Sequence, residues 1–166
     1  MTTVRTILVP IDFSEGSFAA LRHARELASI FHSQLHLLHV ATGPDAPLWA
    51  AELFGSHLRP RQEQERIAAL DRLATLIVAQ GLDPFTTTGL VRMGCPERVI
   101  ADYANEVRAD LVIMGVHGHH SPMISVGRVV ERVLASVSCP VLTIPEQRVA
   151  VDASEAPREL VEALAC

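Results

Sequence analysis

The chain contains no lysine: all fourteen of its basic residues are arginine. This absence excludes two kinds of chemistry, because a Schiff-base mechanism needs a lysine amine and a Walker-type P-loop needs its lysine. Aromatic residues make up only 4% of the chain, so we expect a core of Val, Ile, Leu and Ala. With a net charge of −5 and no basic cluster, the chain also lacks the signature of a general nucleic-acid-binding protein.

Cysteine and long apolar runs are scarce as well. Cys95, Cys139 and Cys166 are odd in number and scattered, which favours a reducing compartment over a disulfide framework. No apolar run reaches the length of a membrane span, and the first residues run directly into an apolar strand pattern without a signal-peptide arrangement. We therefore expect a cytoplasmic protein without membrane contact. Its 166 residues are enough for one domain with a sizeable core.

Short apolar runs alternate with segments of helical period. Continuous apolar runs are typical of strands buried on both faces and predict strands at 6–12, 34–40, 86–92, 111–114 and 140–145. Helical spacing predicts helices at about 15–31, 61–80, 96–107 and after Gly127, and Ser14 is a suitable cap for the first of them. The alternation indicates an α/β protein with a doubly wound, mainly parallel sheet and helices on both faces.

The segment 41–60 has little regular pattern beyond a possible helical turn at 48–54. We interpret it as a long excursion over the carboxyl edge of the sheet, ending near Pro60. Trp49 and Phe54 within it could form a lid over a ligand, an interface patch, or a contact with the chain's own sheet.

The last residues form a separate segment in this interpretation. A domain over 1–146 is followed by an extension, 147–166, which is polar and then carries a short amphipathic piece around Leu160. The extension could be a docked short helix or a frayed end.

One stretch has the order of strand, glycine turn and helix start that binds anions in parallel sheets. The apolar run 111–114 ends at Gly115, Gly118 follows, and Gly127 precedes a helical segment that begins at Arg128. Glycine allows a turn or a close approach of the backbone to a ligand. The unpaired N–H groups and the dipole of a helix N-terminus favour negative charge.

The ends of two other strands point to the same edge of the sheet. Asp12 ends the first apolar run and Val40 ends the second. Ligands of open α/β sheets bind beyond the carboxyl ends of the strands, at the point where the strand order reverses. These two residues and the turn at Gly115 are therefore the first candidates for a binding site.

The order of these blocks resembles the universal stress protein family over residues 3–145. The blocks that carry the resemblance are 7–12, 94–96, 110–118, 131–134 and 139–142. The resemblance implies a five-stranded sheet of order 3-2-1-4-5 and a stress-response role. It also implies a homodimer built through the last strand, here Val141, Leu142, Thr143 and Ile144, and a division into members that bind ATP and members that do not.

For an ATP-binding member, the resemblance implies which residues touch the nucleotide. Asp12 would contact adenine or ribose, the backbone of Val40 would contact adenine, and Pro10 would line the same pocket. The turn and the helix start would hold the rest of the nucleotide, through Met114, Gly115, His117, Gly118, Gly127, Arg128 and Val129. Mg²⁺ could accompany the nucleotide, but the sequence requires no metal. Hydrolysis would be slow and incidental, since no catalytic base is identifiable.

The glycine pattern departs from the Gly-x2-Gly-x9-Gly-Ser/Thr of ATP-binding members. Eight residues separate Gly118 from Gly127, and Arg128 stands where a hydroxyl is expected. Two functions therefore stay open: a nucleotide-binding regulatory module in which Arg128 grips phosphate, or a dimeric interaction module that binds no nucleotide. Arg128 could equally be solvated or paired with Glu131, Asp12 could be a helix-capping acid, and the glycines could be simple turn residues.

His117, His119 and His120 crowd the same loop. A zinc or nickel site needs three or four convergent ligands, and adjacent histidines tend to point apart, so a solvated or phosphate-facing loop is the favoured interpretation. His36 and His39, on the second predicted strand, are interpreted as surface residues of the sheet.

Overall fold

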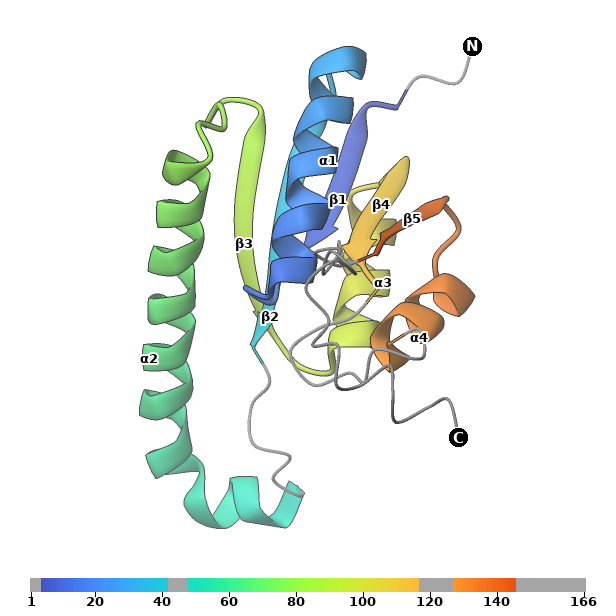
Figure 1. Cartoon of the computed structure of the whole chain (residues 1–166). Helices are drawn as coiled ribbons and strands as arrows, with labels where there is room; N and C mark the ends of the chain where they lie inside the picture. Colours follow the sequence, from blue (N-terminus) through green and yellow to red (C-terminus); the bar gives the residue numbers. More distant parts are fainter. Residues whose placement is uncertain (1–3, 42–47, 117–126, 146–166) are drawn as a thin grey trace, which may run out of the picture.

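The computed structural model describes residues 4–41, 48–116 and 127–145, with the helical backbone alone over 48–61. Strands and helices alternate strictly along these ranges (Figure 1). They are β1 (Thr6–Pro10), α1 (Glu15–Phe31), β2 (Gln34–Ala41), α2 (Leu48–Ala79), β3 (Thr87–Met93), α3 (Pro96–Glu106), β4 (Leu111–Gly115), α4 (Arg128–Ser136) and β5 (Val141–Ile144).

All five strands pair in parallel, in the order β3-β2-β1-β4-β5. The predicted doubly wound α/β fold is confirmed, and so is the strand order that the family resemblance implied. β1 lies at the centre, and the chain winds outward from it first toward β3 and then toward β5. The order therefore reverses between β1 and β4, and this reversal is the place where open α/β sheets bind ligands.

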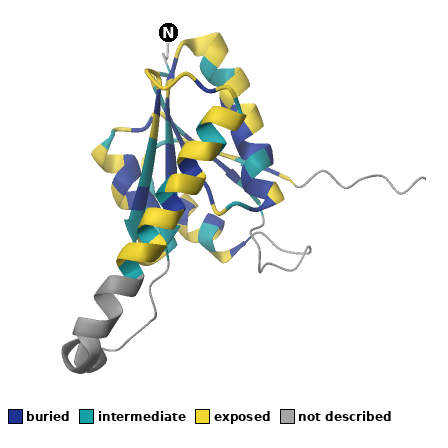
Figure 2. Cartoon of the chain, turned by 90° about the vertical axis from the view of Figure 1, so that its left-hand side faces the viewer, coloured by how far each residue is buried: buried dark blue, intermediate teal, exposed yellow. Residues whose placement is uncertain are grey.

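Helices cover both faces of the sheet. Alternate residues of β1 point to opposite faces: Ile7 packs in a core with α1 and α2, and Leu8 packs in a core with α3 and α4. Both side chains are fully buried, which explains why β1 has a continuous apolar run instead of an alternating one. Figure 2 shows the buried residues concentrated along the strands and on the inner sides of the helices.

The interpretation of 41–60 as an irregular excursion is wrong for its helical part. α2 starts at Leu48, not at 61, and continues for 32 residues. Pro60 lies inside this helix, and Figure 1 shows the helix bending in its N-terminal part. Proline removes one helical hydrogen bond and clashes with the carbonyl four residues earlier, so it kinks a helix that other contacts support. The side chains of Trp49 and Phe54 lie outside the described part.

The first helix is capped as the sequence predicts. Ser14 is the N-cap of α1, and its side-chain oxygen accepts a hydrogen bond from the backbone N–H of Ser17 at 3.2 Å. Ser14 is itself buried, so this cap is held in one place and fixes where α1 begins beyond the end of β1.

The predicted C-terminal extension, 147–166, lies outside the described residues. In the described part, no helix combines the length with the apolar composition that crossing a membrane requires.

Candidate functional site at the carboxyl edge of the sheet

The two central strands separate toward the carboxyl edge. β1 pairs with β2 over its whole length, from Thr6 to Pro10, but with β4 over only two positions. Those two positions, Ile7 and Leu8, are the second and third residues of β1, so its last two residues have no paired partner on β4. β4 meanwhile stays paired with β5 up to Gly115. The sheet therefore opens between β1 and β4 at the carboxyl edge, with the end of each strand on one side of the opening.

On the β1 side, Asp12 organises the turn into α1. Its carboxylate oxygen Oδ1 accepts hydrogen bonds from the backbone N–H of Ser14, at 3.0 Å, and from the Ser14 hydroxyl. Ser14 is the N-cap of α1, so Asp12 supports the capping residue and is not the cap itself. Asp12 is nevertheless solvent-exposed at the sheet edge. A carboxylate held in one orientation and open to solvent is suited to accept hydrogen bonds from a ligand.

The residue after Asp12 has an unusual backbone. Phe13 has φ 62°, in the left-handed region that aromatic residues rarely adopt. Such a conformation costs about 1–2 kcal/mol and persists only where surrounding contacts hold it. The contacts come from His39 of β2, whose ring lies 4.8 Å from the Phe13 ring, and from Arg72 of α2, whose guanidinium carbon lies 3.9 Å from the ring centroid.

His39 also binds the backbone before this turn. Its Nδ1 lies 2.7 Å from the carbonyl oxygen of Ile11. Because a carbonyl can only accept, Nδ1 carries the proton and donates it. His39 is half-buried, and it contacts both the Phe13 ring and the Ile11 carbonyl. Its interpretation as a surface residue of the sheet is therefore incomplete.

On the β4 side, Gly115 is required by close packing. A Cβ on Gly115 would lie 2.7 Å from the carbonyl carbon of Gly16 and 2.8 Å from its oxygen. Gly16 belongs to the first turn of α1, so this contact presses that turn against the end of β4. Gly115 is thus a close-approach glycine, as the sequence suggested, but the backbone that approaches it is the chain's own.

The start of α4 has no side-chain cap among the described residues. Its N-cap is Gly127, which has no side chain to bond the first amides and which donates its own N–H to the carbonyl of Val116 at 3.0 Å. Arg128 follows in the first turn and is exposed. In the described ranges it makes no hydrogen bond or ion pair, so of the two alternatives, solvated or paired with Glu131, the structure fits the solvated one. α4 therefore differs from α1, whose first turn is satisfied by Ser14.

The other predicted site residues fall into two groups. Pro10, Val40 and Val129 are half-buried near the opening, and Val40 and Val129 pack against the core under α3 and α4. Met114 is 5% exposed and belongs to that core, so it can offer a ligand its backbone only. His117 and Gly118 lie outside the described residues.

No metal centre is found in the part of the chain that the structure describes, where no group of three His, Cys, Asp or Glu side chains is placed to hold an ion. His119 and His120 of the histidine loop lie outside this part, so it does not test them.

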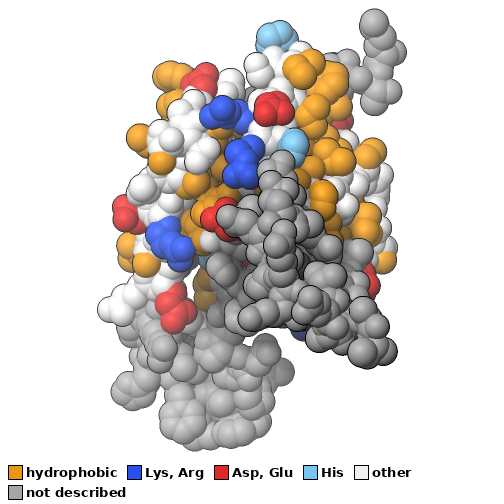
Figure 3. All heavy atoms as spheres, viewed as in Figure 1, with side chains coloured by type: hydrophobic (Ala, Val, Ile, Leu, Met, Phe, Trp, Pro, Cys, Tyr) orange, Lys and Arg blue, Asp and Glu red, His pale blue; other side chains and the backbone are white. Residues whose placement is uncertain are grey.

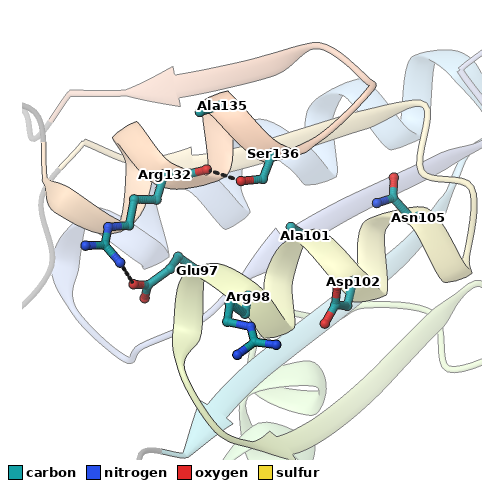
Figure 4. Close-up of a pocket in the computed structure, with 8 residues that line it drawn as sticks. All are labelled: Glu97, Arg98, Ala101, Asp102, Asn105, Arg132, Ala135 and Ser136. Atoms are coloured by element: carbon teal, nitrogen blue, oxygen red, sulfur yellow. Dashed lines mark hydrogen bonds and ion pairs between the residues drawn. The ribbon is translucent and has the colours of Figure 1, made fainter.

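A second hollow lies between α3 and α4, away from the strand opening. It has a volume of about 340 Å³ and is lined by Glu97, Arg98, Ala101, Asp102, Asn105, Arg132, Ala135 and Ser136. Figure 4 shows the ion pair across it, between Arg132 and Glu97, at 2.7 Å. Hydrogen bonding to the Cys95 thiol and the nearby Arg132 lower the pKa of Glu97. Two cations, Arg98 and Arg132, and two anions, Glu97 and Asp102, line the hollow, so it has no net charge to attract a charged ligand.

A third polar cluster lies under α3. His36 Nδ1 lies 2.9 Å from the Tyr103 hydroxyl, and Arg92 lies over the Tyr103 ring. Burial lowers the pKa of His36 and raises that of Tyr103, so both groups are neutral near pH 7. This arrangement satisfies buried polar groups and needs no ligand.

The charges on the visible surface are mixed. On the face shown in Figure 3, the basic and acidic side chains of the described residues are interspersed. The described residues on this face therefore form no continuous basic patch.

These features define a class of protein: a doubly wound α/β domain whose strands 1 and 4 part over an edge that carries an exposed carboxylate and an uncapped helix start. The sequence model of the universal stress protein family matches residues 3–145, and the chain belongs to this family. Universal stress protein Sll1654 from Synechocystis is 32% identical over 142 residues, with 85% of each chain covered. Universal stress protein G from Salmonella typhimurium is 28% identical, covering 84% of this chain and 98% of that protein.

Solved structures share the fold. The structure of the protein MJ0577 from Methanocaldococcus jannaschii superposes with a TM-score of 0.71 at 25% identity, covering 89% of this chain and 99% of that one. A universal stress protein in complex with cAMP gives a TM-score of 0.59 at 20% identity, with 88% and 100% covered. One from Archaeoglobus fulgidus in complex with dAMP gives 0.56 at 20% identity, with 86% and 99% covered.

Proposed function

We propose that this universal stress protein is a regulatory protein that binds an adenine nucleotide, ATP or a relative of it, at the opening between β1 and β4. One observation carries the proposal: Asp12 stands on one side of the opening, and the uncapped first turn of α4 with Arg128 stands on the other. Nucleotides of this kind present hydroxyl and amine donors at one end and anionic oxygens at the other. The site offers a carboxylate for the first and amides with a cation for the second.

The solved relatives support the same ligand class. Two of the structures that share the fold were obtained in complex with cAMP and dAMP, both adenine nucleotides. The lack of a hydroxyl next to Gly127 argues for a different phosphate contact in this chain, and Arg128 is the side chain in place to supply it. The proposed role is binding and signalling, and any hydrolysis would be slow and incidental.

The direct test is calorimetric titration of ATP into protein freed of small molecules, together with chromatography of whatever freshly purified protein releases on denaturation. Saturable binding at about one nucleotide per chain is expected. No released nucleotide and no heat at millimolar ATP would reject the proposal. The alternative, a dimeric interaction module that binds no nucleotide, would then remain.

The Arg128→Ala variant tests the phosphate contact. Because Arg128 is exposed, we expect a modest loss, about threefold in affinity, that shrinks as salt is raised. Arg132→Ala removes another arginine of α4, one engaged by Glu97 across the second hollow, and should leave the affinity unchanged. Equal effects of both variants, or no effect of Arg128→Ala, would exclude the proposed contact.

We also propose that the protein forms a homodimer through β5. β5 is an edge strand of the sheet, and Leu142 on it is 39% exposed, which fits a strand that pairs with a partner. Leu142→Asp should give a monomer in sedimentation equilibrium, because the charge would be buried in the pairing face. Leu134→Asp places the same charge on an exposed leucine of α4 and should leave the dimer intact. A monomeric wild type would reject the proposal.

A further inference from the structure

We propose that Arg72 is a positioning residue for the nucleotide site: through Phe13 it holds the turn that presents Asp12, and it thereby connects the site to α2. This inference rests on the proposed function, since Asp12 is the ligand contact through which Arg72 acts. Arg72 comes from a helix that follows β2, sixty residues after Asp12, and nothing in the family resemblance assigned it a role.

The turn at Phe13 needs support from outside itself. Its φ of 62° is left-handed, and neither glycine nor asparagine occupies the position to relieve the strain. Changing φ at Phe13 would rotate Asp12 relative to Ser14. The hydrogen bond from the Ser14 N–H to Asp12, at 3.0 Å, therefore depends on Phe13 keeping this conformation.

Two side chains from different elements supply that support. The ring of His39, on β2, packs against the Phe13 ring with centroids 4.8 Å apart and donates to the carbonyl of Ile11. The guanidinium of Arg72 covers the Phe13 ring at 3.9 Å. The turn is thus contacted by β2 through His39 and by α2 through Arg72.

Arg72 is suited to hold the Phe13 ring, and it makes no ion pair with another described residue that would draw it away. It is exposed, and its contact in the described ranges is the Phe13 ring. A planar guanidinium stacks on an aromatic face better than a lysine ammonium does. Side chains on a helix point toward its N-terminus, which for α2 is the carboxyl edge of the sheet, where Phe13 lies.

The contact between Arg72 and Phe13 couples α2 to the proposed nucleotide site. α2 packs on β2 and β3 through Ala69 and Leu73, on the same face as α1. A ligand that fixes Asp12 also fixes Phe13 and the Arg72 contact. If nucleotide binding favours the Arg72 contact by some factor, then by linkage the formation of that contact raises nucleotide affinity by the same factor.

The test begins with the affinity of Arg72→Ala for ATP. We expect a loss of about threefold to fivefold, the range of an exposed cation–π contact. Arg25→Ala is the matched control, because the Arg25 guanidinium holds the residue that directly follows α2, by donating to the carbonyl of Gln80 at 2.8 Å, far from the turn. It should leave the affinity unchanged. Unchanged affinity in Arg72→Ala would overturn the inference.

A double-mutant cycle separates positioning from direct contact. If Arg72 acts through Asp12, Arg72→Ala should weaken ATP binding by less than about 1.5-fold in an Asp12→Asn background. The same factor in both backgrounds would mean that Arg72 acts independently of Asp12, and the inference would be wrong.

A readout without nucleotide keeps the two proposals distinguishable. If wild-type protein binds no ATP, the proposed function fails, and hydrogen exchange then tests Arg72 alone. Exchange of the Ser14 amide, which is bonded to Asp12, should be about threefold faster in Arg72→Ala than in Arg25→Ala, while the amide of buried Leu37 exchanges alike in both. Equal protection of Ser14 in the two variants would overturn the inference whatever ATP does.

Discussion

Gly115→Ala is expected to lower the free energy of unfolding by about 3 kcal/mol, at the upper end of what overpacking costs. The added Cβ would lie 2.7 Å from the carbonyl carbon of Gly16, 2.8 Å from its oxygen and 3.0 Å from its Cα. These are backbone atoms of the first turn of α1, which cannot rotate away as a side chain can. That turn would have to move as a unit, together with its Ser14 cap. For a chain of this size the melting temperature should fall by roughly 6–12 °C.

Gly89→Ala is the matched control, a glycine-to-alanine change in strand β3. The nearest atoms to its Cβ would all belong to side chains, Ile77 Cδ1 at 3.0 Å, Leu73 Cδ2 at 3.3 Å and Leu73 Cγ at 3.4 Å. These can shift by a few tenths of an ångström, so we expect a loss below about 1 kcal/mol. Urea unfolding of both variants measures the difference. Equal losses would mean that the contact between Gly115 and Gly16 is not the constraint that fixes α1 against β4.

Asp12→Asn is expected to weaken ATP binding at least about tenfold, because a hydrogen bond to a charged group is worth roughly 1.5–3 kcal/mol. The amide keeps one oxygen that can accept the Ser14 N–H, so the turn and the cap of α1 can persist. What is lost is the negative charge and one acceptor oxygen. The affinity is measured by calorimetry and the fold by urea unfolding.

Asp83→Asn is the matched control, because it makes the same substitution in a turn of similar hydrogen bonding away from the proposed site. Asp83 also accepts the N–H of the second residue after it, Phe85, at 2.9 Å, but in the turn before β3, at the opposite end of the sheet. Its substitution should leave ATP affinity unchanged. An Asp12→Asn protein that binds ATP like wild type would remove Asp12 from the site.

The sequence predicted the fold because its signals were local and consistent. Each strand buried on both faces has a continuous apolar run, and each helix has its own period, so the alternation of elements could be read directly. The error at α2 has an equally local cause. The irregular excursion is predicted to end near Pro60 and the helix to start at 61, although a proline inside a helix can produce a kink.

The site could be predicted only in part. Strand ends and glycines located the edge, because parallel strands bring their carboxyl ends together. The stack of Phe13, His39 and Arg72 could not be found, since phenylalanine gives no sign of a left-handed backbone and Arg72 is distant in sequence. Met114 was expected at the nucleotide, but its side chain lies in the core, because residues of a central strand are buried on either face.

The most direct measurement is a map of amide chemical shifts in ¹⁵N-labelled protein during titration with ATP. The account predicts saturable shifts at both sides of the strand opening, at Asp12, Ser14, Val116 and Gly127. The hollow between α3 and α4 should stay silent, with Arg98, Asp102 and Asn105 unshifted. Shifts confined to that hollow, or no shifts at millimolar ATP, would contradict the claim that this chain binds nucleotide between β1 and β4.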